Sequence, residues 1–154
     1  MSRALSALAV LAIVAIATPV HAQDGAKTVD DAWVKAATAG DVDALVALYA
    51  PDAVLYTPDS MEARGTAAIR AAYEGFVGPN KISNASINST YQTSGDLSTG
   101  WGTATLTLTP KAGGAPQTMT VRVTAVAKKV NGKWLYVADH ASVPMPPQGG
   151  APSK

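Results

Sequence analysis

The sequence contains no cysteine and only two histidines. Without cysteine, disulfide bonds, thiolate metal sites and a cysteine nucleophile are all excluded. One histidine, His21, lies in a segment that we expect to be removed, which leaves His140 as the single imidazole available for chemistry. Scattered carboxylates with one histidine do not make a transition-metal ligand set, so we predict no metal and no cofactor.

The sequence also has little charge of either sign. Charged residues make up 15% of the chain and its formal net charge is +1, with no basic run longer than Lys128-Lys129. Binding to nucleic acid or to an anionic membrane requires clustered basic side chains. We therefore predict neither a nucleic-acid partner nor a membrane partner for the mature protein.

The first 22 residues have the pattern of a signal peptide. Arg3 supplies the positive charge, residues 4–17 form a run of small apolar residues, and Val20-His21-Ala22 is a small-x-small cleavage site. The apolar run is shorter than the roughly 20 residues that span a bilayer, which favours export over a membrane anchor. We expect an exported protein, periplasmic or secreted, whose mature chain starts near Gln23.

The rest of the chain has the length of one ordinary domain. Residues 23–27 are expected to be a flexible lead-in, residues 28–145 the folded domain, and residues 146–154 a disordered tail rich in proline and glycine.

Three helices are predicted before the midpoint of the domain. The first begins at Thr28 and ends at Gly40, the second is capped by Asp41 and ends at Pro51-Asp52, and the third is capped by Thr66. A short apolar strand, residues 53–57, separates the second helix from the third. From Lys81 onward the pattern has period two, with turns at residues 95–96, 112–116 and 131–132. This order predicts an α+β architecture in which an antiparallel sheet curls around the helices as a cone.

The segments YAPDAVLYTP and RGTAAIR, preceded by A-G-D at residues 39–41, resemble the nuclear transport factor 2-like superfamily, in particular its SnoaL-like and ketosteroid-isomerase-like members. The resemblance extends from Thr28 to about Pro144. It implies a cystatin-like, nuclear transport factor 2-like cone with three N-terminal helices packed in a curved antiparallel sheet. It does not imply one function, because this fold carries several enzymes as well as binding modules.

The Asn131-Gly132 pair predicts a tight hairpin turn in which Val130 faces Lys133. Counting back from this turn places Val123 opposite His140 and Val121 opposite Ser142. His140 and Ser142 would then point into the cone, and Asp139 would point outside. In the preceding hairpin, pairing apolar with apolar places Leu106 opposite Val121 and Leu108 opposite Met119, with the threonines facing outward.

His140 is the candidate general acid or base, with Ser142 or a tyrosine to orient it. A lone histidine on an apolar strand face is also explained as a core residue with one hydrogen bond. Related SnoaL-like chains commonly end in a strand patterned like W-L-Y-V-A-D-H-A-S, residues 134–142, whose H-x-S faces the cavity. The candidate ligand-binding residues share an aromatic or polar side chain that we expect to face the cavity: Trp33, Tyr49, Tyr56, Thr57, Tyr73, Phe76, Tyr136, His140 and Ser142. Aromatic residues spaced along helices are usually core residues, so core packing also explains each aromatic residue in this set.

Comparison with ketosteroid isomerases argues against steroid isomerase activity. Those enzymes carry a carboxylate base just before the proline that ends the first strand, and a tyrosine in the first helix. Here Thr57 precedes Pro58 and Trp33 stands at the helix position. Thr57 cannot abstract a carbon-bound proton near neutral pH. A standard steroid isomerase is therefore excluded on residues, although the scaffold fits.

These observations predict an exported protein that binds a small apolar or aromatic molecule in the cone. One alternative is an isomerase-, lyase- or hydrolase-like enzyme with His140 as general acid or base. The other is a dimeric association module without turnover. We expect a homodimer through the outer sheet face, which carries Trp101 and Arg122.

Overall fold

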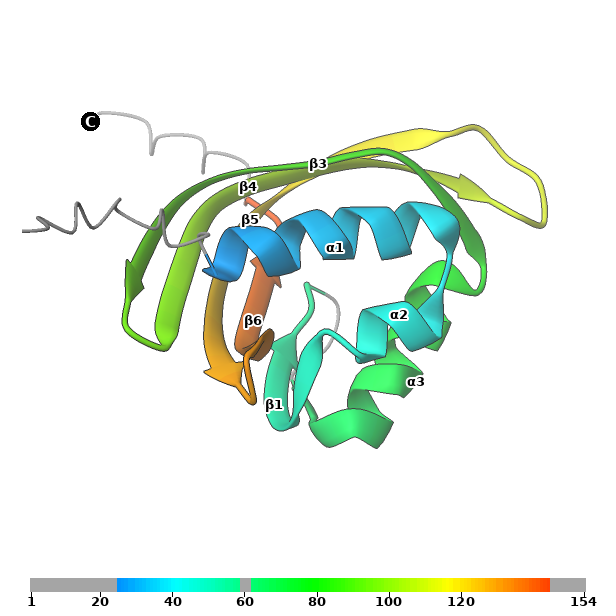
Figure 1. Cartoon of the computed structure of the whole chain (residues 1–154). Coiled ribbons are helices and arrows are strands. Elements are labelled where there is room, and N and C mark those ends of the chain that lie inside the picture. Colours follow the sequence, from blue (N-terminus) through cyan, green and yellow to red (C-terminus); the bar gives the residue numbers. More distant parts are fainter. Residues whose placement is uncertain (1–24, 59–61, 145–154) are drawn as a thin grey trace, which may run out of the picture.

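The computed structural model describes residues 25–58 and 62–144 (Figure 1). The expected leader, residues 1–22, and the expected tail, residues 146–154, lie outside the described residues, so export stays a prediction. None of the described helices is long and apolar enough to cross a membrane. In chain order the elements are α1 (Gly25–Ala39), α2 (Val42–Val46), β1 (Tyr49–Tyr56), β2 (Ala63–Arg64), α3 (Gly65–Val77), β3 (Asn80–Ser94), β4 (Leu97–Pro110), β5 (Gln117–Val130) and β6 (Lys133–Ser142).

The strands form one curved sheet in the order β2-β1-β6-β5-β4-β3, and the three helices lie on its concave side (Figure 1). The predicted cone of three N-terminal helices inside a curved sheet is confirmed. The sheet is mixed and not purely antiparallel as expected, because β1 pairs with β6 in parallel. The early strand thus lies beside the last one, and residues from both ends of the domain meet at this junction.

The junction between α1 and α2 follows the expected chemistry, and the start of α3 does not. Gly40 has φ 68° and its N–H donates to the Ala37 carbonyl, while the Asp41 N–H donates to the Ala36 carbonyl, which is a Schellman ending. The Asp41 carboxylate then accepts from the Ala44 N–H at 2.9 Å and caps α2. The expected Thr66 cap is wrong, because α3 begins at Gly65 and its N-cap position, Arg64, makes no side-chain cap hydrogen bond.

Two element boundaries differ from the sequence expectation. Helix α1 starts at Gly25, three residues before Thr28, because the buried Ser98 hydroxyl accepts the Ala26 N–H at 3.0 Å and caps the helix from across the fold. Helix α2 has only five residues, and β1 begins already at Tyr49, so Pro51 lies within a strand and not at a helix end. The β1–β6 register is irregular between Tyr49 and Val54. A proline that cannot donate a ladder hydrogen bond is tolerated at such an irregularity.

The β5–β6 hairpin folds at the predicted turn. Asn131 and Gly132 have φ values of 50° and 80°, and Val130 pairs with Lys133 as expected. The register then follows the prediction as far as Ala127 opposite Tyr136. At the next step Val126 pairs with Ala138, so Val137 is an extra residue in β6 and forms a β-bulge.

The bulge reverses the direction of every side chain beyond it. Ala125 now pairs with Asp139 and Val123 pairs with Ala141, so Asp139 and Ala141 face the inside of the cone. The predicted inward direction of His140 and Ser142, and the predicted outward direction of Asp139, are therefore wrong. A shift of one residue moves a strand's whole inner set to the outer face.

The β4–β5 hairpin also differs in register from the expectation, but without this consequence. Leu106 pairs with Met119, and Ala104 pairs with Val121. The shift from the expected pairing is two residues, so the inner and outer faces keep their predicted side chains. Trp101 lies on the outer face and is 44% exposed. Arg122 is also exposed, and the homodimer expected on this face stays a prediction.

We predict that deletion of Val137 leaves the fold and the inward direction of Asp139 intact. Without the extra residue, Tyr136 and Ala138 become neighbours in the chain and can keep their pairings with Ala127 and Val126 in a regular ladder, so that Ala125 still pairs with Asp139. The variant should unfold cooperatively with a loss of unfolding free energy of about 1–3 kcal/mol, measured by urea denaturation followed by circular dichroism. Deletion of Ala112, exposed in the connection between β4 and β5, is the matched control and should cost less. Loss of cooperative unfolding in the variant without Val137 alone would contradict this account of the bulge.

Candidate functional site

A cavity of about 720 Å³ lies between the helices and the concave face of the sheet. Its volume is within the range of small-molecule sites. Among the predicted ligand-binding residues, the cavity wall contains Trp33, Thr57, Tyr73, Phe76 and Tyr136. Most of the remaining wall is aliphatic and comes from α3 and the sheet: Leu55, Ala71, Ala72, Ile87, Ala104, Leu106, Leu108, Met119, Val121, Val123, Ala125, Ala141 and Val143.

The other four predicted site residues do not line this cavity. Tyr49 is buried behind the wall, where its hydroxyl reaches the carboxylate of Asp139. Tyr56 and His140 lie opposite one another on β1 and β6 and border a separate, open groove on the outer face of the sheet. Ser142 contributes to neither space. The bulge at Val137 explains the displacement of His140 and Ser142.

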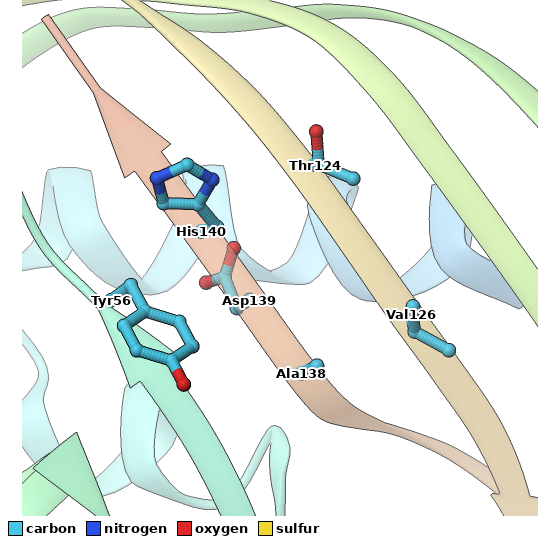
Figure 2. Close-up of a pocket in the computed structure, with 6 residues that line it drawn as sticks. All are labelled: Tyr56, Thr124, Val126, Ala138, Asp139 and His140. Carbon is cyan, nitrogen blue, oxygen red and sulfur yellow. The ribbon is translucent and has the colours of Figure 1, made fainter. Parts of the chain in front are cut away.

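The outer groove has a volume of about 460 Å³, and Figure 2 shows its residues from three neighbouring strands: Tyr56, Thr124, Val126, Ala138, Asp139 and His140. The imidazole of His140 stands edge-on to the ring of Tyr56, with 6.1 Å between ring centroids. Asp139 borders both spaces. Among the described residues, no group of three or more histidine and acidic side chains is placed to hold a metal ion.

A chain of hydrogen bonds joins the cavity wall to Asp139. The Trp33 indole N–H donates to the Tyr73 hydroxyl at 2.7 Å, the hydroxyls of Tyr73 and Tyr49 are 2.6 Å apart, and Tyr49 donates to Asp139 Oδ2 at 2.6 Å. Tyr49 has one hydroxyl hydrogen and gives it to the carboxylate, so the hydrogen between the two tyrosines must come from Tyr73. Every donor in the chain therefore points towards Asp139.

Removal from water dominates the electrostatics of Asp139. Desolvation raises the pKa of its carboxyl from 3.8 to about 6; the hydrogen bond from Tyr49 opposes this rise, and the charge of Asp30 adds to it. Burial and the nearby Asp139 charge also raise the pKa of the Tyr49 hydroxyl well above 10, so this phenol stays a neutral donor near neutral pH. Asp139 is thus a carboxyl group whose proton is exchangeable close to physiological pH.

Asp30, on α1, is a second carboxyl group in the cavity wall and is 5% exposed. Tyr136 donates to its Oδ1 and Tyr91 donates to its Oδ2 at 2.8 Å, so both oxygens are engaged. Desolvation raises the pKa of Asp30, and the two tyrosine hydrogen bonds oppose that rise. Tyr49 and Tyr136 are in ring contact, with centroids 5.1 Å apart, so the two carboxyl networks meet in one aromatic cluster.

Sequence reasoning missed three residues of this site, namely Asp30, Tyr91 and Asp139. A signal for Asp30 was available, because Asp30 lies one helical turn before Trp33 and therefore shares its face of α1. A weaker signal marked the bulge: residues 134–137, WLYV, are all apolar, so this part of the strand shows no alternation. The base position of ketosteroid isomerases, Thr57, does line the cavity, and the carboxyl groups of the described wall come instead from α1 and β6.

We predict that Asp139→Asn stabilises the protein at pH 8 and has little effect at pH 4. A carboxyl whose folded pKa is raised stabilises the fold below its unfolded pKa of 3.8 and loses that contribution as pH rises through about 6. The rise of the pKa from 3.8 to about 6 corresponds to at most about 3 kcal/mol of unfolding free energy at pH 8. Asparagine keeps an acceptor for Tyr49 without the buried charge.

Urea denaturation of the parent, of Asp139→Asn and of Asp96→Asn across this pH range tests the prediction. Asp96 lies exposed in the turn between β3 and β4, so its variant controls for the loss of one surface carboxylate. A stability difference between the parent and Asp139→Asn that does not grow from pH 4 to pH 8 would show that this carboxyl carries no desolvation penalty.

Comparison with known proteins agrees with this fold. The SnoaL-like domain model matches residues 31–137. A proposed calcium/calmodulin dependent protein kinase II association domain from Xanthomonas campestris is 30% identical, with a TM-score of 0.71 over 79% of this chain and 86% of that one. A ketosteroid isomerase-like protein from Erwinia carotovora atroseptica is 22% identical, with a TM-score of 0.63 over 78% of this chain and 94% of that one.

A third solved structure, a nuclear transport factor 2-like protein of unknown function from Pseudomonas putida, is 20% identical, with a TM-score of 0.65 over 80% of this chain and 87% of that one. No curated protein matches the chain. The match of the family model over most of the described residues shows that the chain belongs to the SnoaL-like domain family, and the solved structures show that it shares the nuclear transport factor 2-like fold.

Proposed function

We propose that this protein binds a small, largely apolar molecule inside the cone. The observation that carries the proposal is the cavity of about 720 Å³, whose wall is mostly aliphatic and aromatic with a few polar groups. This combination of concave apolar surface and sparse, fixed polar groups is typical of small-molecule sites. The polar groups that would orient the molecule are Asp139, Thr57 and Asn80.

Two valines of β5 allow a matched test of where a ligand binds. Val123 lines the cavity, whereas Val126 lines the outer groove three residues further along the same strand. We predict that Val123→Trp fills the cavity and weakens binding of a neutral apolar probe, N-phenylnaphthylamine, by about tenfold or more. Val126→Trp should leave probe affinity unchanged, because its side chain lies on the opposite face of the sheet.

Fluorescence titration measures both affinities, and circular dichroism confirms that both variants are folded. Equal affinities in the two variants would exclude the cone as the binding site. Native mass spectrometry of the protein purified from its own host then reports the retained molecule and the number of subunits together.

A second candidate function is proton transfer, which the pKa of Asp139 favours. A general acid or base works best when its pKa is near the working pH, and the carboxyl of Asp139 has a pKa of about 6 and borders the cavity. His140 does not fill this role inside the cone, because its imidazole borders the outer groove. The enzyme alternative therefore rests on Asp139, with Tyr49 orienting its carboxyl group.

Conversion of the molecule retained from the host tests this candidate. We predict that Asp139→Asn lowers the rate by about a hundredfold or more, whereas His140→Gln leaves it unchanged. A role as base would make the rate rise with pH through about 6, and a role as acid would make it fall. If the parent protein releases the retained molecule unchanged, the proton-transfer function is wrong and only the binding function stands.

A further inference from the structure

The cavity wall has an uneven distribution of charge. It contains two carboxyl groups, Asp30 and Asp139, and no lysine, arginine or histidine among the described residues that form it. Three of the basic side chains make contacts elsewhere. Lys27 pairs with Asp31 on the surface, Arg70 pairs with Asp43, and Lys111 donates to the carbonyl of Val77. The protein thus supplies no cationic partner to either carboxyl group within the described wall.

Neutral phenols donate hydrogen bonds to these carboxyl groups but bring no positive charge. The charge of Lys27 acts on Asp30 from the surface, and no basic side chain of the described residues does the same for Asp139. Tyr49 donates to Asp139, and Tyr91 and Tyr136 donate to Asp30. A desolvated charge without a counter-ion is costly, and a cation placed beside it recovers part of that cost. A ligand that carries a carboxylate or phosphate would instead add like-charge repulsion in a cavity of low polarity.

The two carboxyl groups differ in their ability to meet a ligand. Asp30 has one oxygen held by each of two tyrosines, whereas the side-chain hydrogen bond that Asp139 receives from Tyr49 uses Oδ2. The carboxyl group of Asp139 also accepts a hydrogen bond from the backbone N–H of His140, but Asp139 is half-buried whereas Asp30 is buried, so Asp139 is the better acceptor for a donor that enters the cavity. Trp33, Tyr73 and Phe76 add aromatic rings to the same wall. The faces of aromatic rings attract cations, most strongly when water is excluded.

We propose that the cone is selective for small apolar amines, with the protonated amino group hydrogen-bonded to Asp139 and the apolar body against the aliphatic wall. The inference rests on the proposed binding function and names its ligand class. A charge-assisted N–H···O hydrogen bond is about twice as strong as a neutral one, and Asp139 is oriented for it by Tyr49 before the ligand arrives. Asp30 is a second carboxyl group in the same cavity wall and needs no direct contact.

A series of three ligands with one naphthyl body tests the proposal. Naphthylmethylamine is a cation, naphthylmethanol is neutral, and naphthylacetate is an anion. Isothermal titration calorimetry at pH 7.5 should give an affinity for the amine about tenfold or more above that for the alcohol, and no measurable binding of the anion. The amine should lose its advantage as pH falls from 7.5 to 5, because Asp139 takes up a proton while an aliphatic amine stays charged.

Two variants identify the carboxylate responsible. Asp139→Asn should bind the amine and the alcohol equally and keep its affinity for the alcohol. Asp31→Asn, which removes an exposed carboxylate from the same helix as Asp30, should keep the full preference and controls for net charge. A preference for the amine that survives in Asp139→Asn would overturn the assignment.

The results with the parent protein distinguish failure of the amine selectivity from failure of the proposed binding function. If the alcohol binds as tightly as the amine, the cone binds apolar molecules but the amine selectivity is wrong. If no member of the series and no neutral probe binds, the binding function itself fails and the ligand class fails with it.

Discussion

The candidate site depends on one irregularity of the backbone, the extra residue Val137 in β6. Strand β6 is central in the sheet, with β1 on one side and β5 on the other, so both neighbours fix its register. On the β1 side Leu55, a buried residue, pairs with Asp139; on the β5 side Ala125, also buried, pairs with the same residue. These two pairings hold the carboxyl group towards the cavity. A bulge in an interior strand cannot change register without breaking the hydrogen bonds to both neighbouring strands. The direction of the polar side chain that follows it is therefore fixed.

An inward carboxyl group destabilises an ordinary apolar core, because burial removes its charge from water. Here it is held by a one-way chain of donors that begins at the Trp33 indole and passes through Tyr73 and Tyr49. The chain satisfies hydrogen bonding but brings no positive charge, so the carboxylate remains destabilised relative to water, and its pKa rises to about 6. A group that costs stability where it stands, while its surroundings fix its orientation, is characteristic of functional sites.

Much of the fold could be predicted from the sequence because its signals are local. The glycine ending of α1, the aspartate cap of α2 and the asparagine–glycine hairpin each depend on a few neighbouring residues, and the structure has all three. The errors arise where distant contacts decide. Ser98 caps α1 from β4, and the parallel pairing of β1 with β6 draws Tyr49 into a strand. The bulge at Val137 has the largest consequence. The turn is predicted correctly, but counting from it with strict alternation ignores the extra residue and assigns His140 and Asp139 to the wrong faces of the sheet.

The two functions considered for the cone are linked through the charge of the ligand. A cation beside Asp139 favours the ionised carboxylate and lowers its pKa, so the carboxyl group then acts as a fixed counter-ion and holds no proton to transfer. A neutral ligand expels water without supplying charge, which keeps the pKa near or above 6 and leaves Asp139 able to take up or release a proton at physiological pH. The same carboxyl group in the same position is therefore a recognition element for an amine and an acid or base for a neutral substrate. On this electrostatic argument the charge of the bound molecule, and not a further residue of the protein, determines which of the two roles Asp139 performs.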